Sequence, residues 1–311
     1  MFITGFEGFL GSNLALCLLE LGADIIGLDI KIYRKKTILI PGDYKRITII
    51  KGSVENYRLL DEIIKRHKVQ VIFHLAAKAL VGECLKEPLS AFSNNIKGTW
   101  NILECSRLAS GVRAVIIASS DKAYGSNKKL PYREEARLSG RHPYDVSKSC
   151  ADLLASSYYH TYKIPVGITR CGNIYGPGDF NLSRLIPGAI ESVLKGRVFE
   201  IRSDGKYIRD YIYVEDVVCG YILLAQQLER KKLAGGAFNF SNEKPLSVMD
   251  VLKAIYRIVG RKPNYKILNT VKCEIKKQYL SAQKARSVLG WKPKYSLEAG
   301  LRKTIQVCRL Q

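Results

Sequence analysis

Close pairs of cysteine and histidine are missing from this sequence. Its eight cysteines and four histidines lie singly along the chain, without the spacing of a metal site or a redox motif. We therefore expect no bound metal. Isolated cysteines are typical of proteins from a reducing compartment, so we expect free thiols and a cytoplasmic location.

Long apolar runs are missing as well. No segment approaches the ~20 apolar residues that a membrane-spanning helix needs. The first residues also lack a basic segment followed by an apolar stretch and a small-residue cleavage site, which is the pattern of a secretory signal. We therefore expect neither a membrane span nor a secretory signal.

Negative charge is scarce. The chain carries 28 acidic residues against 50 lysines and arginines, which gives a net charge of +22. Such a surface can attract nucleic acid, an anionic membrane or diphosphate compounds. Aromatic residues are not interleaved with the basic runs, as they are in proteins that bind single strands, so we expect no nucleic-acid partner.

The composition is otherwise that of a globular protein, with 47% hydrophobic residues in a chain of 311. In the first half, short apolar runs alternate with amphipathic stretches, which is the pattern of a parallel sheet with crossover helices. The expected strands are Phe2–Thr4, Asp24–Leu28, Ile47–Ile50, Val71–Leu75, Ala114–Ser119 and Pro165–Arg170. The expected helices lie near Ser12–Leu21, Tyr57–His67, Asn95–Ala109 and Tyr144–Tyr162. Together they predict an α/β fold with a doubly wound parallel Rossmann sheet.

The pattern loosens after Gly172, where glycine and proline interrupt short mixed segments. We predict a Rossmann domain that binds the cofactor over residues 1–172. A smaller C-terminal α/β lobe that binds the substrate is predicted over residues 173–311. No linker separates the two parts, and the chain can cross between the lobes.

A glycine-rich loop follows the first expected strand. Gly5, Gly8 and Gly11 have the spacing G-x-x-G-x-x-G between a strand and a helix. Glycines there permit a tight turn and bring backbone amides close to a pyrophosphate at a helix N-terminus. The loop therefore predicts a dinucleotide cofactor.

An acidic residue, Asp29, ends the second strand. A carboxylate at this place can bind the ribose hydroxyls of NAD and repels the ribose phosphate of NADP. We therefore expect NAD, although the nearby Lys31 and Arg34 leave NADP open.

A tyrosine and a lysine lie four residues apart on an expected helix. Tyr144 and Lys148 therefore share one helix face. A lysine ammonium beside a phenol lowers its pKa, so we expect Tyr144 to take a proton from a substrate hydroxyl near neutral pH. Ser120 follows the preceding strand, where its hydroxyl should face a cofactor bound at the carboxyl edge of the sheet.

Together these motifs resemble the extended short-chain dehydrogenases/reductases, a family that contains nucleotide-sugar epimerases and dehydratases. The resemblance runs from Ile3 to Pro293 and rests also on the segments His74–Ala77, Arg170–Pro177 and Arg209–Asp216. It implies NAD as the cofactor and a nucleotide-diphosphate sugar as the substrate. The cofactor-binding residues that it implies are Gly5, Gly8, Phe9, Leu10, Gly11, Asp29, Ile30, Val54, Leu75, Ala76, Ala77, Lys78, Tyr144 and Lys148.

Within the resemblance, the two residues after Ser120 separate the reactions. The family's 4-epimerases tend to have small or neutral residues there, whereas its 4,6-dehydratases have an acid and a base that remove water across carbons 5 and 6. Asp121 and Lys122 occupy these positions, and the pair is most similar to CDP-glucose 4,6-dehydratases. We therefore predict an NAD-dependent 4,6-dehydratase that makes a nucleotide-linked 4-keto-6-deoxy sugar. Its catalytic residues are Ser120, Asp121, Lys122, Tyr144 and Lys148.

Two alternatives stay open. A nucleotide-sugar 4-epimerase of the UDP-glucose/galactose type needs only Ser120, Tyr144 and Lys148. The Asp121–Lys122 pair is then an exposed salt bridge in a turn, worth about 0–1 kcal/mol. A non-catalytic module that binds a cofactor or RNA could use the basic charge, but it would have no need of the tyrosine, lysine and serine together.

The resemblance also implies the substrate side of the site. Arg184 and Arg209 resemble residues that face the diphosphate, for which a guanidinium fork is well shaped. Asn173 resembles a residue that bonds near the sugar phosphates. Lys78 stands where a neutral polar residue is usual, so we expect a more basic pocket and include Lys78 among the substrate-binding residues.

Other positions depart from the family pattern. Ser53 replaces a usual aspartate near adenine, and Gln278 stands where many relatives use a second diphosphate-binding arginine. The resemblance finally implies a homodimer, because helices like Asn95–Ala109 and Tyr144–Tyr162 pair across subunits in relatives.

Overall fold

A parallel sheet forms the centre of the protein. The computed structural model describes residues 1–33, 37–127, 129–228, 230, 232–270 and 275–310. The strands of the sheet are β1 (Phe2–Thr4), β2 (Ile25–Asp29), β3 (Ile47–Lys51), β4 (Val71–His74), β5 (Ala114–Ala118), β6 (Val166–Cys171) and β10 (Ala237–Phe240). Their order is β10-β6-β5-β4-β1-β2-β3, and all neighbouring pairs are parallel. Because β1 lies inside the sheet and the chain winds outward from it in both directions, the predicted doubly wound fold is confirmed.

The six expected strands are confirmed to within one residue at either end. The sequence does not predict the seventh strand, β10, which comes from the second half of the chain and pairs with β6. The chain therefore crosses back from the second lobe to complete the sheet. The division at residue 172 stays a prediction about domains, but the sheet itself is not confined to residues 1–172.

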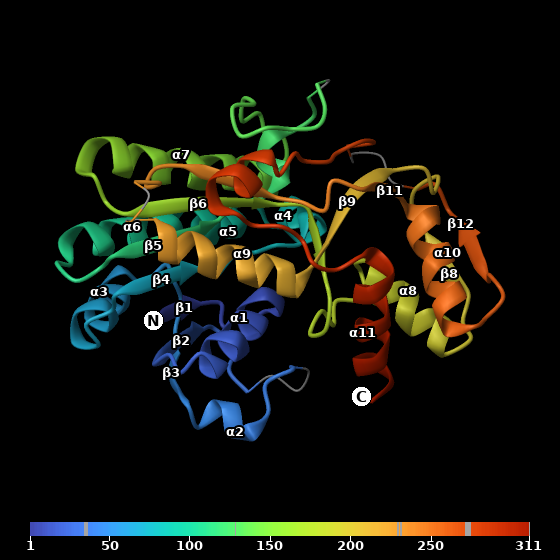
Figure 1. Cartoon of the computed structure of the whole chain (residues 1–311), viewed down its shortest axis with the longest axis horizontal. Helices are drawn as coiled ribbons and strands as arrows, with labels where there is room; N and C mark the ends of the chain where they lie inside the picture. Colours follow the sequence, from blue (N-terminus) through green and yellow to red (C-terminus); the bar gives the residue numbers. More distant parts are fainter. Residues whose placement is uncertain (34–36, 128, 229, 231, 271–274, 311) are drawn as a thin grey trace.

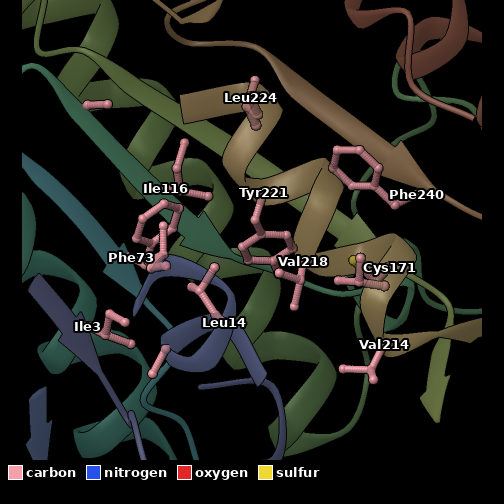
Figure 2. Close-up of a cluster of buried hydrophobic side chains, with 14 of the residues drawn as sticks. Ile3, Leu14, Phe73, Ile116, Cys171, Val214, Val218, Tyr221, Leu224 and Phe240 are labelled. Carbon is pink, nitrogen blue, oxygen red and sulfur yellow. The ribbon is translucent and has the colours of Figure 1, made fainter. Parts of the chain in front are cut away.

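Helices cover both faces of the sheet (Figure 1). One face carries α3 (Tyr57–Arg66), α6 (Gly98–Leu108) and α7 (Pro143–Tyr162), and the other carries α1 (Phe9–Glu20) and α9 (Val214–Gln227). Side chains alternate along a strand, so Phe2 and Ile72 pack under the first group, whereas Ile3 and Phe73 pack under the second. Figure 2 shows the second core, in which Tyr221 of α9 and Phe73 belong to one cluster.

Short helices and turns follow the carboxyl ends of several strands. They are α2 (Pro41–Tyr44), α4 (Val81–Lys86), α5 (Pro88–Phe92), the π-turn η1 (Ser93–Lys97) and the 3₁₀ turn η2 (Asp121–Tyr124). The helix expected over Asn95–Ala109 therefore begins as a π-turn that leads from α5 into α6. Such turns are frequent at functional sites.

A smaller α/β lobe lies beside the sheet, at the right of Figure 1, as the sequence predicts. Its elements are β7 (Asn173–Tyr175), α8 (Leu185–Leu194), β8 (Phe199–Ile201), β9 (Ile208–Tyr213), β11 (Pro245–Ser247), α10 (Val248–Val259), β12 (Tyr265–Ile267) and α11 (Leu297–Arg309). β11, β9 and β7 form one sheet, and β12 and β8 form another. Ile190, Ile255 and Leu301, one from each helix, share its core. The π-turn η3 (Ala285–Leu289) returns to the core over the main sheet.

Membrane-spanning helices and clusters of metal ligands are absent from the described residues. None of their helices combines the length and the apolar character needed to cross a membrane. Nor do their His, Cys, Asp and Glu side chains gather in a group that could hold a metal ion.

Candidate active site

The glycine loop is packed so closely that side chains are excluded. Gly5 has a φ of +71°, and a Cβ on it would lie 2.9 Å from the backbone N and Cα of Ala76. A Cβ on Gly11 would lie 2.1 Å from the carbonyl oxygen of Gly5. The loop between β1 and α1 therefore passes directly against the loop that follows β4, and side chains at Gly5 and Gly11 would not fit.

The N-terminus of α1 has the features of an anion site. Gly8 is its N-cap and provides no side-chain cap, and the first turn, which begins with Phe9 and Leu10, contains no acidic residue. The backbone amides of this turn can therefore donate to a pyrophosphate, which the helix dipole also favours. The glycine loop and this helix end fit a dinucleotide.

Asp29 is fixed at the carboxyl end of β2. Its Oδ1 accepts from the backbone N of Lys31 at 3.2 Å, and its Oδ2 accepts from the backbone N of Glu7 at 3.3 Å. Ile30, the next residue, is exposed. The carboxylate is thus buried beside the glycine loop, where the adenosine ribose of a dinucleotide would lie. Arg34, which leaves NADP open, lies outside the described residues.

The loop after β4 carries the segment Leu75 to Lys78. The backbone N of Leu75 donates to Thr4 O at 3.2 Å, and that of Ala76 donates to Thr4 Oγ1 at 3.2 Å. Ala77 follows, half-buried like its neighbours. The Nζ of Lys78 lies 2.8 Å from Glu87 Oε2. The expectation of a more basic pocket is therefore too simple, because a carboxylate pairs with this ammonium.

Val54 lies on the opposite side of this region, buried after β3. Its carbonyl oxygen accepts from the side-chain amide of Asn101 at 3.0 Å. Gly98 of α6 also packs on Val54, since a Cβ there would lie 2.5 Å from the Val54 Cγ2. These contacts place Val54 where β3 and α6 meet.

Ser120 begins the turn that follows β5. Its Oγ accepts from the backbone N of Lys122 at 3.2 Å and donates to Asp121 Oδ1 at 3.1 Å. The Nζ of Lys122 donates to both carboxylate oxygens of Asp121, at 2.9 and 3.1 Å. The side chain of Asp121 is only 3% exposed and that of Lys122 17%. The pair is therefore a largely buried ion pair joined to the serine, unlike the exposed turn contact that was the alternative.

Tyr144 and Lys148 lie one turn apart on α7. The Nζ of Lys148 donates to Ala118 O at 2.7 Å and lies 6.0 Å from the centre of the Tyr144 ring. Burial lowers the pKa of Lys148 to about 8. The Ser120 hydroxyl acts to lower the pKa of Tyr144, so the serine lies near the tyrosine and the lysine.

The expectation of a lowered pKa for Tyr144 is wrong in this structure. Burial raises the pKa of Tyr144 to about 12, and Asp121 adds to the rise. The Ser120 hydroxyl and the positive charge of Arg184 act in the opposite direction but are outweighed. Desolvation of a phenolate thus dominates over its polar neighbours.

Three of the four expected substrate residues lie on the second lobe, and the fourth, Lys78, lies in the loop after β4. Arg184 is the N-cap residue of α8 and its Nη1 lies 3.1 Å from Asp179 Oδ2. Arg209 is buried on β9, with its guanidinium 5.7 Å from the centre of the Tyr207 ring. Asn173 is half-buried on β7, which pairs with β9 in parallel. The positive charge of Arg184 acts to lower the pKa of Tyr144, so Arg184 lies near the catalytic tyrosine.

Comparison with known proteins agrees with this geometry. Residues 2–304 match the family model described as GDP-mannose 4,6 dehydratase. The chain belongs to this family. The expected relationship to nucleotide-sugar epimerases and dehydratases is confirmed, and the chain is an enzyme of that type.

Relatives of this chain include both 4-epimerases and 4,6-dehydratases. UDP-glucose 4-epimerase from Halalkalibacterium halodurans is 30% identical over 312 residues, 95% of this chain and 91% of the relative. CDP-glucose 4,6-dehydratase from Salmonella typhimurium is 29% identical over 98% of this chain and 89% of its own length. The crystal structure of dTDP-glucose 4,6-dehydratase from Streptomyces venezuelae with NAD and TYD bound has a TM-score of 0.90 at 26% identity. It covers all of this chain and matches over 97% of its own.

One buried residue of this family member escapes the sequence prediction. Asn95, in the π-turn η1, accepts from the backbone N of Lys78 at 2.8 Å and donates to Lys78 O at 3.1 Å and Ser147 Oγ at 2.9 Å. It therefore holds the loop after β4 against α7, next to Lys148. The sequence carries no clear signal for it, because Asn95 is the first residue of the expected helix Asn95–Ala109, where asparagine is an ordinary cap.

Proposed function

We propose that this enzyme is an NAD-dependent nucleotide-sugar 4,6-dehydratase. The observation that carries the proposal is the buried Asp121–Lys122 pair, joined to Ser120 and next to Tyr144. An oxidation and reduction at carbon 4 needs only the serine, tyrosine and lysine. A buried acid and base beside them provide for a second step, the loss of water.

The cofactor site fits NAD. The glycine loop and the N-terminus of α1 would hold the pyrophosphate, Asp29 would bind the ribose hydroxyls, and the loop from Leu75 to Lys78 would line the approach to the nicotinamide. When bound, NAD would supply the hydride acceptor for carbon 4 and the hydride donor for carbon 6. Solved relatives with NAD bound support this assignment.

The first step belongs to Tyr144. Its phenolate accepts the proton of the 4-hydroxyl while carbon 4 becomes a ketone. The phenolate is uncommon when its pKa is about 12, so it needs positive charge nearby, which Lys148 supplies from 6.0 Å. Ser120 lies near Tyr144, whose pKa its hydroxyl acts to lower, and it can hold the same substrate oxygen in place.

The second step belongs to Asp121 and Lys122. Transfer of one proton from the Lys122 ammonium to the Asp121 carboxylate turns the ion pair into a neutral amine and a neutral acid, without any change in its net charge. Exclusion of water by the substrate favours this neutral form. The amine then removes the proton from carbon 5, which the ketone has acidified, and the acid donates its proton to the departing 6-hydroxyl.

The atoms balance over the cycle. The elimination leaves Lys122 charged and Asp121 ionised, which is the ion pair of the structure. Lys122 returns a proton to carbon 5 after exchange with solvent, while hydride returns to carbon 6. Lys122 is then neutral and Tyr144 protonated. Tyr144 releases the proton that it took from the 4-hydroxyl and Lys122 takes one up, through solvent, which restores the starting state and balances the proton consumed in forming water. The product is a 4-keto-6-deoxy sugar.

The nucleotide-diphosphate sugar would lie between polar groups of the two lobes. Arg184 and Arg209 provide guanidinium groups for the diphosphate, and Asn173 lies on the neighbouring strand β7. Lys78 would contribute from the opposite loop. The Asp–Lys pair favours CDP-glucose as the first substrate to test, and a CDP-glucose 4,6-dehydratase is among the relatives.

A homodimer formed by α6 and α7 is part of the proposal. Trp100 of α6 is 43% exposed and Leu153 of α7 is 59% exposed, although both are large and apolar. Leu89 of α5, which packs beside α7, is 83% exposed. A second copy would cover these side chains. We also place the protein in the cytoplasm, since the seven cysteines of the described residues carry free thiols.

A 4-epimerase is the second candidate. Relatives at about the same identity include a UDP-glucose 4-epimerase, and Ser120, Tyr144 and Lys148 suffice for that reaction. In an epimerase the Asp121–Lys122 pair would only stabilise its turn.

The product mass separates the two. The enzyme is incubated with CDP-glucose, GDP-mannose, dTDP-glucose and UDP-sugars in turn, and each product is weighed by mass spectrometry. The proposal expects one of these substrates to lose one water. Unchanged mass together with inversion at carbon 4 would instead establish the epimerase.

A further inference from the structure

A segment of the second lobe reaches the catalytic turn. Gln278 is fully buried, and its side-chain Nε2 donates to the backbone oxygen of Asp121 at 2.8 Å. Its own backbone N donates to Ile208 O at 3.1 Å, and Ile208 forms a parallel bridge with Lys277. Gln278 follows Lys277 and Arg209 follows Ile208, so both lie one residue beyond this bridge. The segment thus lies between the catalytic turn and the strand of the expected diphosphate contact.

The backbone on the C-terminal side of Gln278 is held independently of its side chain. Tyr132 donates its backbone N to Tyr279 O at 3.0 Å, and Ser281 donates its backbone N to Tyr132 O at 2.9 Å. Leu280 N donates to the carboxylate of Asp210 at 3.4 Å. A change of the side chain at position 278 therefore removes the contact with Asp121 without removing the bonds that hold the segment.

The contact falls at the reactive end of the turn. The far end of η2 is held at the carbonyl oxygen of Ala123, which accepts from Ser149 Oγ at 2.9 Å and from Ser139 N at 3.0 Å. Gln278 instead holds Asp121 itself, whose carboxylate and Lys122 partner would perform the elimination. The Oε1 of Gln278 is buried without a hydrogen-bond partner, which costs free energy. The amide is therefore better explained by its bond to Asp121 than by its contribution to stability.

We propose that Gln278 is a positioning residue for the Asp121–Lys122 pair, which it ties to the strand of the second lobe that carries Arg209. The proposal rests on the proposed function, because it assigns a role in the elimination step. Gln278 touches neither the sugar nor the cofactor in this role. It fixes the turn from which the acid and the base project.

Replacement by methionine isolates the donor. Gln278→Met keeps the length of the side chain and removes Nε2. Elimination is followed as water loss from CDP-glucose, or from whichever nucleotide sugar the wild type dehydrates. Oxidation at carbon 4 is followed separately with the matching 6-deoxy sugar, which has no 6-hydroxyl to lose. We expect elimination to slow by about tenfold to a hundredfold, as for a small misplacement of reacting groups, and oxidation to stay near the wild-type rate.

A matched control exists on α9. Gln227 also donates its Nε2 to a backbone oxygen, that of Leu289 at 3.2 Å, and its Oε1 is likewise buried without a partner. Gln227→Met removes an equivalent bond away from the catalytic turn. It should lower thermal stability by a similar amount and leave both half-reactions unchanged.

Replacement of Gln278 by glutamate adds a pH-dependent readout that a general loosening of the structure would not change. In Gln278→Glu the carboxylic acid can donate to Asp121 O only while it is protonated. The new group would contact Asp121, which Lys122 follows in the turn, and it would lie beside β9, which carries Arg209 and Asp210. Burial raises the pKa of such a carboxyl. The ratio of variant to wild-type elimination should approach one at acid pH and fall to the Gln278→Met value as pH rises.

The outcomes are distinguishable. If the wild type removes water but Gln278→Met does so equally fast, the positioning role is wrong. The same holds if both half-reactions fall together at every pH, since that is the behaviour of a structural contact. If the wild type removes water from no nucleotide sugar, the proposed function itself fails and the role of Gln278 falls with it.

Discussion

Replacement of Lys148 by methionine measures how the buried ammonium acts on Tyr144. Burial lowers the pKa of Lys148 to about 8 and raises that of Tyr144 to about 12. The ammonium lies 6.0 Å from the centre of the Tyr144 ring. With the phenolate charge placed at the ring centre, an ammonium at this distance stabilises it by about 3 kcal/mol at an effective dielectric constant of about 20, or about two pKa units. The active form carries both the ammonium and the phenolate.

These two titrations predict the shape of the pH profile. Below a pH of about 8 the lysine stays charged, and each unit of pH raises the phenolate population tenfold. Between about 8 and about 12 the gain in phenolate is offset by the loss of ammonium, so kcat/KM levels off. A positively charged nicotinamide lowers both pKa values, which moves the break to lower pH without removing it.

Lys148→Met should lose this break. Its kcat/KM should keep rising with pH and should be about a hundredfold below wild type near neutral pH, since about two pKa units of phenolate stabilisation are gone. The assay follows formation of the dehydrated product from neutral pH to well above the break. Lys65→Met, a replacement of an exposed lysine on α3, serves as the control. A Lys148→Met profile that still levels off at the wild-type pH would refute the assignment to Lys148.

Three further substitutions test the general base, the cofactor loop and a buried ion pair. Tyr144→Phe should lower turnover roughly 10²- to 10⁴-fold, as expected for loss of a general base, with steady-state kinetics showing a nearly unchanged KM. Gly11→Ala should abolish measurable NAD binding by calorimetry, because the new Cβ would lie 2.1 Å from Gly5 O; binding like that of wild type would remove the pyrophosphate from this loop. Asp152→Asn should lower the free energy of unfolding by about 3–5 kcal/mol in urea titrations, because Arg170 loses the buried carboxylate that it contacts at 2.7 and 2.8 Å. A loss of about 1 kcal/mol or less would mean that the Arg170 guanidinium finds another partner.

The sequence could predict that the site residues come together, because the carboxyl ends of parallel strands meet at one edge of the sheet. Asp29, Leu75 and Ser120 follow or end different strands of the sheet, and the fold brings these ends together. The four-residue spacing of Tyr144 and Lys148 likewise becomes a shared helix face. Local patterns decide these features, so the sequence alone contains them.

Features that depend on distant partners could not be predicted. β10 is a four-residue run between glycines and a serine, and it becomes a strand only by pairing with β6. The raised pKa of Tyr144 reflects burial, which no spacing reveals. The pairing of Lys78 with Glu87 and the bond from Gln278 to Asp121 also join residues whose meeting depends on the folded chain.

The central claim is that Asp121 and Lys122 perform an elimination. The most direct measurement is the reaction of CDP-glucose, or of the nucleotide sugar that reacts, in heavy water, with the product examined by mass spectrometry and NMR. We expect a product that has lost one water and carries deuterium at carbon 5, and no such product from the double variant Asp121→Asn, Lys122→Met. A product of unchanged sugar composition, inverted at carbon 4, without deuterium at carbon 5 and formed equally well by the double variant, would contradict this claim.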